Sequence, residues 1–194
     1  MAVSSDVVKE LRERTGISVM QCKAALEEAG GDMDKALMLL RKKGSAIADK
    51  KGDRSLGAGA LAAYVHANKK IAAVVELQSE TDFVAKNEDF IKLAYELALQ
   101  VAASSPLYLT RADVPAEEMD KIKAMYVADV EGKPENLKET ILAGKIDSYM
   151  KGIVFYEQLY IKDDSLTIKQ LIDNAVQKFG ERIEVGSFRR FVTK

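Results

Sequence analysis

Few side chains in this sequence could carry catalytic or metal chemistry. It has one cysteine, Cys22, and one histidine, His66, among 194 residues. Zinc sites, Cys-His nucleophilic pairs and internal disulfides need more of these residues. The acidic pairs Glu27-Glu28, Glu117-Glu118 and Asp163-Asp164 are neighbours in sequence, and such neighbours do not face each other across a cleft. We therefore expect no cofactor, no metal site and no enzymatic activity.

The sequence also lacks the glycine motifs that bind phosphates or present a nucleophile. G-x-x-x-x-G-K-[ST], G-x-G-x-x-G and G-x-S-x-G are all missing. Cys22 has the spacing of a buried helical residue, where a lone thiol is usually an inert hydrophobic group. His66 stands at the end of a predicted strand, beside a turn. We expect it at the surface, without a role in proton transfer.

One short segment has two interpretations. Thr81-Asp82-Phe83-Val84 places a large aromatic residue beside a carboxylate, at the junction between a predicted strand and a predicted helix. Neither regular pattern fixes the side-chain directions at such a junction. Phe83 could anchor the core beside Asp82, or it could protrude to contact another molecule, and the residue types leave both interpretations open.

The composition is that of a soluble globular protein. It is 47% hydrophobic and 30% charged. Its net charge of -1 argues against a general nucleic-acid binder. There is no apolar run of about 18 residues, and no basic segment followed by an apolar one near the N-terminus. We therefore expect neither a membrane span nor a secretory signal, and a protein of a reducing compartment.

The segment 45–58 is predicted to be a linker, because it is rich in lysine, glycine and aspartate. Basic residues in and just before it could follow a phosphate backbone. No aromatic residues are interleaved with them, although proteins that bind single strands usually supply these. We favour a solvated linker over a nucleic-acid site. The basic residues are Arg41, Lys42, Lys43, Lys50, Lys51 and Arg54.

Residues 1–44 are predicted to form a bundle of three helices, each about ten residues long, between residue 4 and about residue 43. The expected caps are Ser4 or Ser5, Ser18 in a capping box with Gln21, and Asp32. Such a small bundle is only marginally stable by itself. The residues expected to face its interior are Val7, Val8, Leu11, Val19, Cys22, Leu26, Ala29, Met33, Ala36, Leu37 and Leu40.

Residues 59–194 are predicted to form the main core, which begins with an antiparallel hairpin whose turn lies at residues 67–70. A last strand, residues 182–192, shifts its alternation at Gly186, as a bulge would do. The apolar residues that share one side of each hairpin strand are Leu61, Ala63 and Val65, and then Ile71, Ala73, Val75 and Leu77.

Helices are predicted between these strands. Asn87 caps the first, and Pro115 and Pro134 lie in the first turns of two others. A capping box of Thr167 with Gln170 opens the last. A sheet with segregated helices makes the fold α+β. The buried stripe of the first of these helices is Phe90, Leu93, Ala94, Leu97, Ala98 and Val101.

Two blocks of the sequence resemble the elongation factor Ts family, the guanine nucleotide exchange factors for elongation factor Tu. The first runs from Val8 to Gly16 as VKELRERTG, followed by Met20, Cys22-Lys23 and Ala25-Leu26. The second is ETDFVAKN, at residues 80–87. The order of elements is also similar, with a ubiquitin-associated-like helical domain, a linker, and an exchange core that includes Gly132-Lys-Pro134.

The resemblance implies that elongation factor Tu is the partner and that no covalent chemistry is involved. The segment Thr81 to Val84 would contact the partner, with Asp82 and Phe83 inserted near its Mg²⁺ and nucleotide. The residues of the helical domain that would grip another part of the same partner domain are Arg12, Val19, Met20 and Lys23. The family also implies a cytoplasmic location, or the interior of an organelle.

The sequence departs from the family pattern at Val19, at Ile17-Ser18, where the family has a Gly-rich turn, and at Gln100. Val19 stands where the family commonly has methionine, and Gln100 stands where it often has histidine, so we transfer no contact to Gln100. At 194 residues the chain resembles the short form, which is half of a core completed by dimerisation. Because there is no cysteine near the C-terminus, the expected homodimer is non-covalent.

Two other functions compete with nucleotide exchange. The helical domain could serve an adaptor that binds ubiquitin-like or ribosomal partners, but an adaptor has no need of the Thr81 to Val84 segment. The basic linker could serve an RNA-associated translation protein. Binding of that kind falls steeply with salt.

Overall fold

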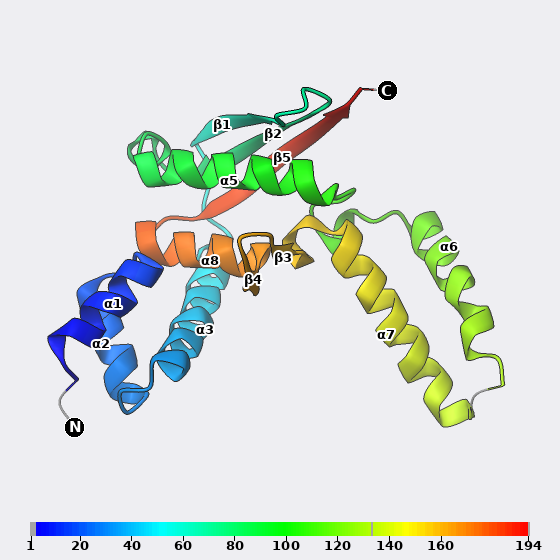
Figure 1. The fold of residues 1–194 in the computed structure, drawn as a ribbon, viewed down its shortest axis with the longest axis horizontal. Coiled ribbons are helices and arrows are strands. Elements are labelled where there is room, and N and C mark those ends of the chain that lie inside the picture. The colour runs from blue at the N-terminus through cyan, green and yellow to red at the C-terminus, as the bar shows by residue number, and fades with distance from the viewer. Residues whose placement is uncertain (1–2, 133, 194) are drawn as a thin grey trace.

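The computed structural model describes residues 3–132 and 134–193. Residues 1, 2 and 194 lie outside the described residues, although the predicted domains include them. So does Lys133 of the Gly132-Lys-Pro134 segment. The fold is α+β, as the sequence predicts (Figure 1). The helices are α1 (Ser5–Thr15), α2 (Val19–Glu28), α3 (Met33–Lys51), α4 (Asp82–Ala85), α5 (Glu88–Ser104), α6 (Ala116–Val127), α7 (Glu135–Ile153) and α8 (Ile168–Phe179). The strands are β1 (Ala58–Val65), β2 (Ile71–Ser79), β3 (Leu159–Tyr160), β4 (Asp163–Thr167) and β5 (Ile183–Val192), and the 3₁₀ helices are η1 (Arg111–Asp113), η2 (Ala128–Val130) and η3 (Phe155–Glu157).

The N-terminal helices begin at the caps that the sequence predicts. The side chain of Ser4 accepts a hydrogen bond from the backbone N–H of Val7, Ser18 caps α2, and Asp32 caps α3. Gly16 ends α1 with a positive φ of 68°, which glycine adopts without strain. The buried residues of this small core are Val8, Leu11, Ile17, Cys22, Ala25, Leu26, Ala36 and Leu40.

Val19 does not face the interior of the bundle, and that prediction is wrong. Val19 is 52% exposed. Val19 is the first residue of α2, and Ile17 in the preceding turn takes the buried position at that end of the core. Val19 is therefore available to contact another molecule.

Helix α3 is longer than the sequence indicates. It continues to Lys51 instead of ending near residue 43, so residues 45–51 of the predicted linker are helical. The extra turns pack on α8. A Cβ on Gly44 would lie 3.1 Å from Oε1 of Gln177 and 3.4 Å from the backbone oxygen of Asp173, so the two helices approach closely here. The hydroxyl of Ser45 donates to the buried carboxylate of Asp173 at 2.8 Å.

The sheet has the strand order β1-β2-β5 and is antiparallel throughout. The hairpin is confirmed, with His66 and Ile71 joined across its turn. The bulge at Gly186 is also confirmed, because Glu76 pairs with Ser187 and Leu77 with Val185, so that Gly186 is left over. Strand β2 is therefore central.

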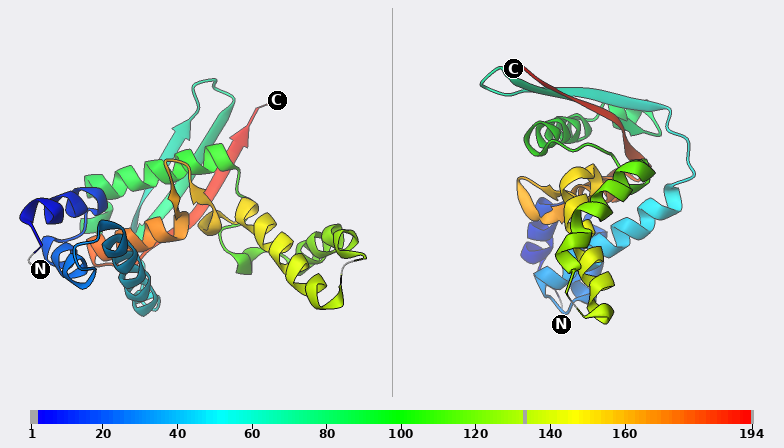
Figure 2. Two further views of the ribbon diagram at one scale, coloured as in Figure 1. Left: turned by 60° about the horizontal axis from the view of Figure 1, so that its bottom comes forward. Right: turned by 90° about the vertical axis from the view of Figure 1, so that its right-hand side faces the viewer.

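The two faces of this sheet differ. The inner face, which includes Val75 and Leu77, packs on α5 and belongs to the main core. Leu61, Ala63 and Val65 share one side of β1, but that side is exposed, and Ala60, Ala62 and Tyr64 point inward instead. Figure 2 shows α5 below the sheet, and no described element covers its opposite, outer face.

The helices of the core confirm most of the predicted pattern. Asn87 caps α5, Thr167 and Gln170 form a capping box on α8, and Pro115 and Pro134 are N-caps, one residue earlier than expected. Helices α6 and α7 form an arm that projects from the body (Figure 2). The arm has a small core of its own around Ile122 and Met150. All six residues of the predicted α5 stripe are buried, namely Phe90, Leu93, Ala94, Leu97, Ala98 and Val101.

Gly44→Val should weaken the packing of α3 on α8. The larger side chain overlaps α8, and we expect the free energy of unfolding to fall by about 1–3 kcal/mol. Gly144→Val in α7 is the matched control, because no described atom beyond its own helix lies within 4 Å of a Cβ built there. Both variants carry the same change in helix propensity, so the difference between their urea unfolding curves measures the packing. Equal losses would contradict the proposed contact.

Candidate protein-binding site

The segment Thr81 to Val84 forms a sharp turn at the edge of the main core. Strand β2 ends at Ser79, Thr81 is extended, and the single helical turn α4 follows. Val84 is buried in the core. Asp82 and Phe83 point outward, and Phe83 is 85% exposed. Of the two interpretations of the sequence, the structure thus has the protruding Phe83.

Residues from both sides in sequence hold this turn. The Oε1 atom of Glu80 accepts hydrogen bonds from the backbone N–H of Arg182 at 2.6 Å and from Arg54 at 3.2 Å. The Arg182 N–H and the Arg54 guanidinium lower the pKa of the Glu80 carboxyl, and partial desolvation opposes them. The carboxylate of Glu181 binds Thr81. The sequence did not predict the contacts of residues 181 and 182, because no spacing rule relates positions a hundred residues apart.

The four site residues predicted in the helical domain lie close together. Arg12, Val19 and Lys23 line a shallow cavity of about 290 Å³ between α1 and α2. Met20 follows Val19 in α2 and is 83% exposed. Lys23 also makes a weak ion pair with Glu27 at 3.8 Å. The four residues thus supply two exposed apolar side chains, Val19 and Met20, and two cations, Arg12 and Lys23.

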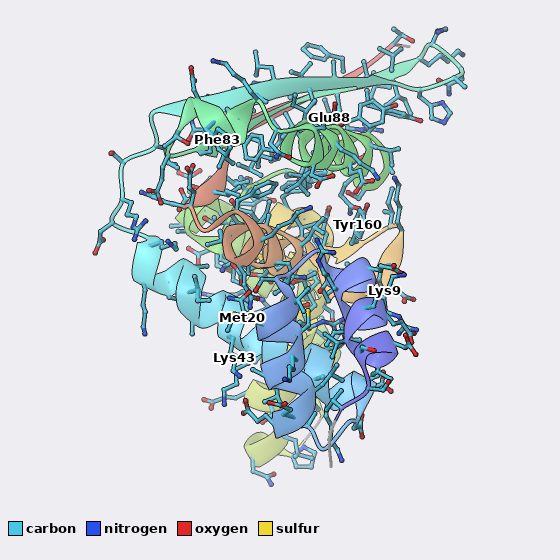
Figure 3. All side chains as sticks on the ribbon, turned by 90° about the vertical axis from the view of Figure 1, so that its left-hand side faces the viewer. Lys9, Met20, Lys43, Phe83, Glu88 and Tyr160 are labelled. Atoms are coloured by element: carbon cyan, nitrogen blue, oxygen red, sulfur yellow. The ribbon has the colours of Figure 1, made fainter. Side chains whose placement is uncertain are left out.

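The turn and the helical-domain surface occupy the same end of the molecule. Figure 3 looks at that end, with Phe83 near the sheet and Met20 on α2. Helix α8 lies between them and packs on α3. One large partner could therefore contact both places at once.

The other candidate residues have structural roles. The thiol of Cys22 is buried and donates to the backbone oxygen of Ile17 at 3.6 Å. Nδ1 of His66 accepts the backbone N–H of Asn68 in the hairpin turn. Gln100 is buried and ties α5 to β3, because its amide donates to Leu159 and accepts from Ile161.

Much of the basic stretch is engaged within the protein. Arg41 binds Ser165, Lys43 pairs with Glu28, and Lys51 donates to the backbone oxygen of Gly180. Arg54 pairs with Glu80. These contacts favour a structural role over a phosphate-binding one.

Within the described residues, no group of three or more His, Cys, Asp or Glu side chains could hold a metal ion. No helix among them is long and apolar enough to cross a membrane.

Comparison with known proteins gives consistent matches. A family model described as Elongation factor TS matches residues 39–193. Elongation factor Ts of Thermotoga petrophila is 50% identical over 191 residues, which cover 98% of this chain and 96% of the relative. The protein of the same name from Herpetosiphon aurantiacus is 47% identical, with 98% of each chain covered. That of Maridesulfovibrio salexigens is 45% identical and covers 98% of this chain and 93% of the relative.

Because Phe83 is exposed, its loss should leave the fold intact. We expect Phe83→Ala to change the free energy of unfolding by less than about 0.5 kcal/mol. Phe90→Ala is the contrasting variant, since Phe90 is fully buried, and it should cost about 3–5 kcal/mol. Thermal or urea unfolding measures both. A large loss for Phe83→Ala would mean that this side chain packs into the core.

Proposed function

The chain belongs to the elongation factor Ts family, and on this basis we propose that it binds elongation factor Tu and promotes the exchange of GDP for GTP. The observation that carries the proposal is Phe83, a large apolar side chain that protrudes beside Asp82 from a short turn anchored in the core. We call Asp82 and Phe83 the wedge. Thr81 and Val84 complete the contact segment, with Val84 as its anchor.

The wedge acts by displacement. Mg²⁺ requires near-octahedral geometry and bridges protein groups to the nucleotide phosphates. Phe83 inserted near that site moves its surroundings, so the ion and the nucleotide are held less tightly, and no covalent bond is made or broken. This mechanism is non-enzymatic and needs no cofactor on this chain.

The helical-domain surface provides the second contact. Val19 and Met20 offer apolar area to a helix of the same partner domain, while Arg12 and Lys23 suit acidic side chains at its margin. Because α3 packs on α8, this surface and the wedge keep a fixed separation. Such preorganisation lowers the entropic cost of engaging both.

Thermodynamic linkage requires this protein and the nucleotide to weaken each other's binding to elongation factor Tu equally. Whatever factor by which this protein weakens GDP binding to elongation factor Tu, GDP weakens the binding of this protein by the same factor. The same holds for GTP. Nucleotide of either kind therefore releases the factor, which can act again.

The proposal divides the chain by role. Residues 1–44 form the helical contact domain, residues 45–58 join it to the core, and residues 59–194 form the exchange core. We place the activity in the cytoplasm, or in an organelle interior for an organellar homologue.

A second copy of this chain is the proposed occupant of the outer face of the sheet. Leu61 is 76% exposed there, and Ala63 and Val65 continue the apolar surface along β1. The pairing register puts Glu76 and Arg189 on the same face. In a two-fold dimer Glu76 of one copy can meet Arg189 of the other, which makes the face complementary to itself. Two such sheets packed together bury the apolar surface that a single sheet leaves in water.

Phe83→Ala should slow the release of GDP from elongation factor Tu about ten- to a hundredfold, because burial of a phenylalanine is worth about 1.5–3 kcal/mol. Stopped-flow measurement with a fluorescent GDP analogue reports the rate at limiting factor concentration. Met125→Ala on the arm is the control, since Met125 is also an exposed apolar residue, and should keep the wild-type rate. Release at wild-type speed with Phe83→Ala would overturn the wedge.

Linkage predicts that excess GDP dissociates the complex of this protein with elongation factor Tu. The protein and GDP-loaded elongation factor Tu should elute together from a sizing column, and excess GDP should separate them. The mass of the complex reports whether one or two copies of the 21.3 kDa chain take part. A complex that excess GDP leaves intact contradicts an exchange role.

Leu61→Asp should dissociate the homodimer, because it buries a charge in the apolar contact without a partner. Sedimentation should give two associated copies for the wild type and single chains for the variant. Leu137→Asp, an exposed leucine on the arm, should stay dimeric. A wild type that sediments as a single chain refutes the dimer.

A further inference from the structure

Phe83 cannot set its own position. Its side chain is almost wholly in solvent, and it stands on a helix of only four residues. One helical turn is unstable in isolation, because nucleation fixes several dihedral angles for a single hydrogen bond. The direction of Phe83 therefore depends on whatever fixes the backbone of α4.

The start of α4 lacks the usual N-cap hydrogen bond from a side chain. Thr81 is the N-cap, and within the described residues its hydroxyl makes no hydrogen bond to the helix that it precedes. Instead, its hydroxyl donates to Oε1 of Glu181 at 2.6 Å, and its backbone N–H donates to Oε2 of the same carboxylate at 3.0 Å. Both donors of Thr81 thus end on one side chain, and hydrogen bonds to a charged acceptor are stronger than neutral ones.

The backbone on both sides of Glu181 is held by hydrogen bonds. It lies between Gly180, which ends α8, and Ile183, where β5 begins. The backbone oxygen of Gly180 accepts a hydrogen bond from Lys51 at 2.7 Å. The backbone N–H of Arg182 donates to Glu80, the residue before Thr81. The segment 180–182 therefore connects the end of α3, the end of α8 and the start of the wedge turn.

We propose that Glu181 is a positioning residue for the wedge, one that holds Thr81 so that Phe83 points at the partner before binding. This inference rests on the proposed exchange function and deepens it. Glu181 does not touch the partner in this role. It acts through Phe83 by removing the freedom of the turn, which binding would otherwise have to remove.

Glu181→Gln tests the role, because the amide keeps the size of the side chain but turns one acceptor into a donor that faces a donor of Thr81. We expect GDP release at limiting factor to slow about three- to tenfold, as the net loss of one ordinary hydrogen bond implies, because the amide oxygen still accepts one of the two. Glu117→Gln, an exposed glutamate on α6, is the matched control and should leave the rate unchanged. Thr81→Val removes the hydroxyl from the other side of the contact and should slow release in the same direction.

A double-mutant cycle with Phe83→Ala separates positioning from general damage. If Glu181 acts through Phe83, Glu181→Gln should have no further effect on GDP release in the Phe83→Ala background. A loss of the same factor in both backgrounds, or a wild-type rate for Glu181→Gln alone, overturns the positioning role. If Phe83→Ala itself exchanges at wild-type speed, the proposed function fails first, so the two failures are distinguishable.

Discussion

The packing of α3 against α8 is the contact on which the arrangement of this protein depends. It crosses at Gly44, where a side chain would overlap α8, and it includes the Asp173 carboxylate, which is buried but receives Ser45 and Lys169. A buried charge is tolerated only with such partners. Without this contact, α1 and α2 would belong to a marginally stable bundle that is only flexibly connected to the rest of the protein. With it, they are fixed to the body that carries the sheet and α4.

A second set of contacts fixes the arm at the opposite end. Arg111 in η1 binds the carboxylates of Glu157 and Asp147, which come from η3 and α7. These hydrogen bonds raise the pKa of the Arg111 guanidinium above its usual value. A parallel bridge between Tyr108 and Val154 adds backbone support. The two ends of the molecule are thus organised separately, the arm by its root and the candidate protein-binding site by α3, α8 and the junction at residues 180–182.

Local signals in the sequence predicted most of the fold, since caps, alternation and helical stripes act between near neighbours. The caps at Ser18, Asp32 and Asn87 and the bulge at Gly186 are of this kind. Tertiary contacts decided the rest. Residues 45–51 have a linker composition, yet they are helical because α8 offers a surface to pack on. Alternation grouped Leu61 with Ala63 and Val65 but could not say which face meets the core. Motif resemblance indicated the candidate site, while the hydrogen bond from Thr81 to Glu181 joins positions that no sequence pattern links.

The order of the strands also affects how the chain is made. The central strand, β2, pairs on one side with β1, which is already synthesised, and on the other with β5, which follows about a hundred residues later. At about 5–20 residues per second, the ribosome takes roughly 5–20 seconds to cover that distance. During this interval the hairpin and α5 can assemble, but one edge of β2 keeps its backbone hydrogen-bonding groups unpaired. An open strand edge of this kind invites pairing with other chains, so the nascent protein is exposed to aggregation at this edge until its last strand arrives.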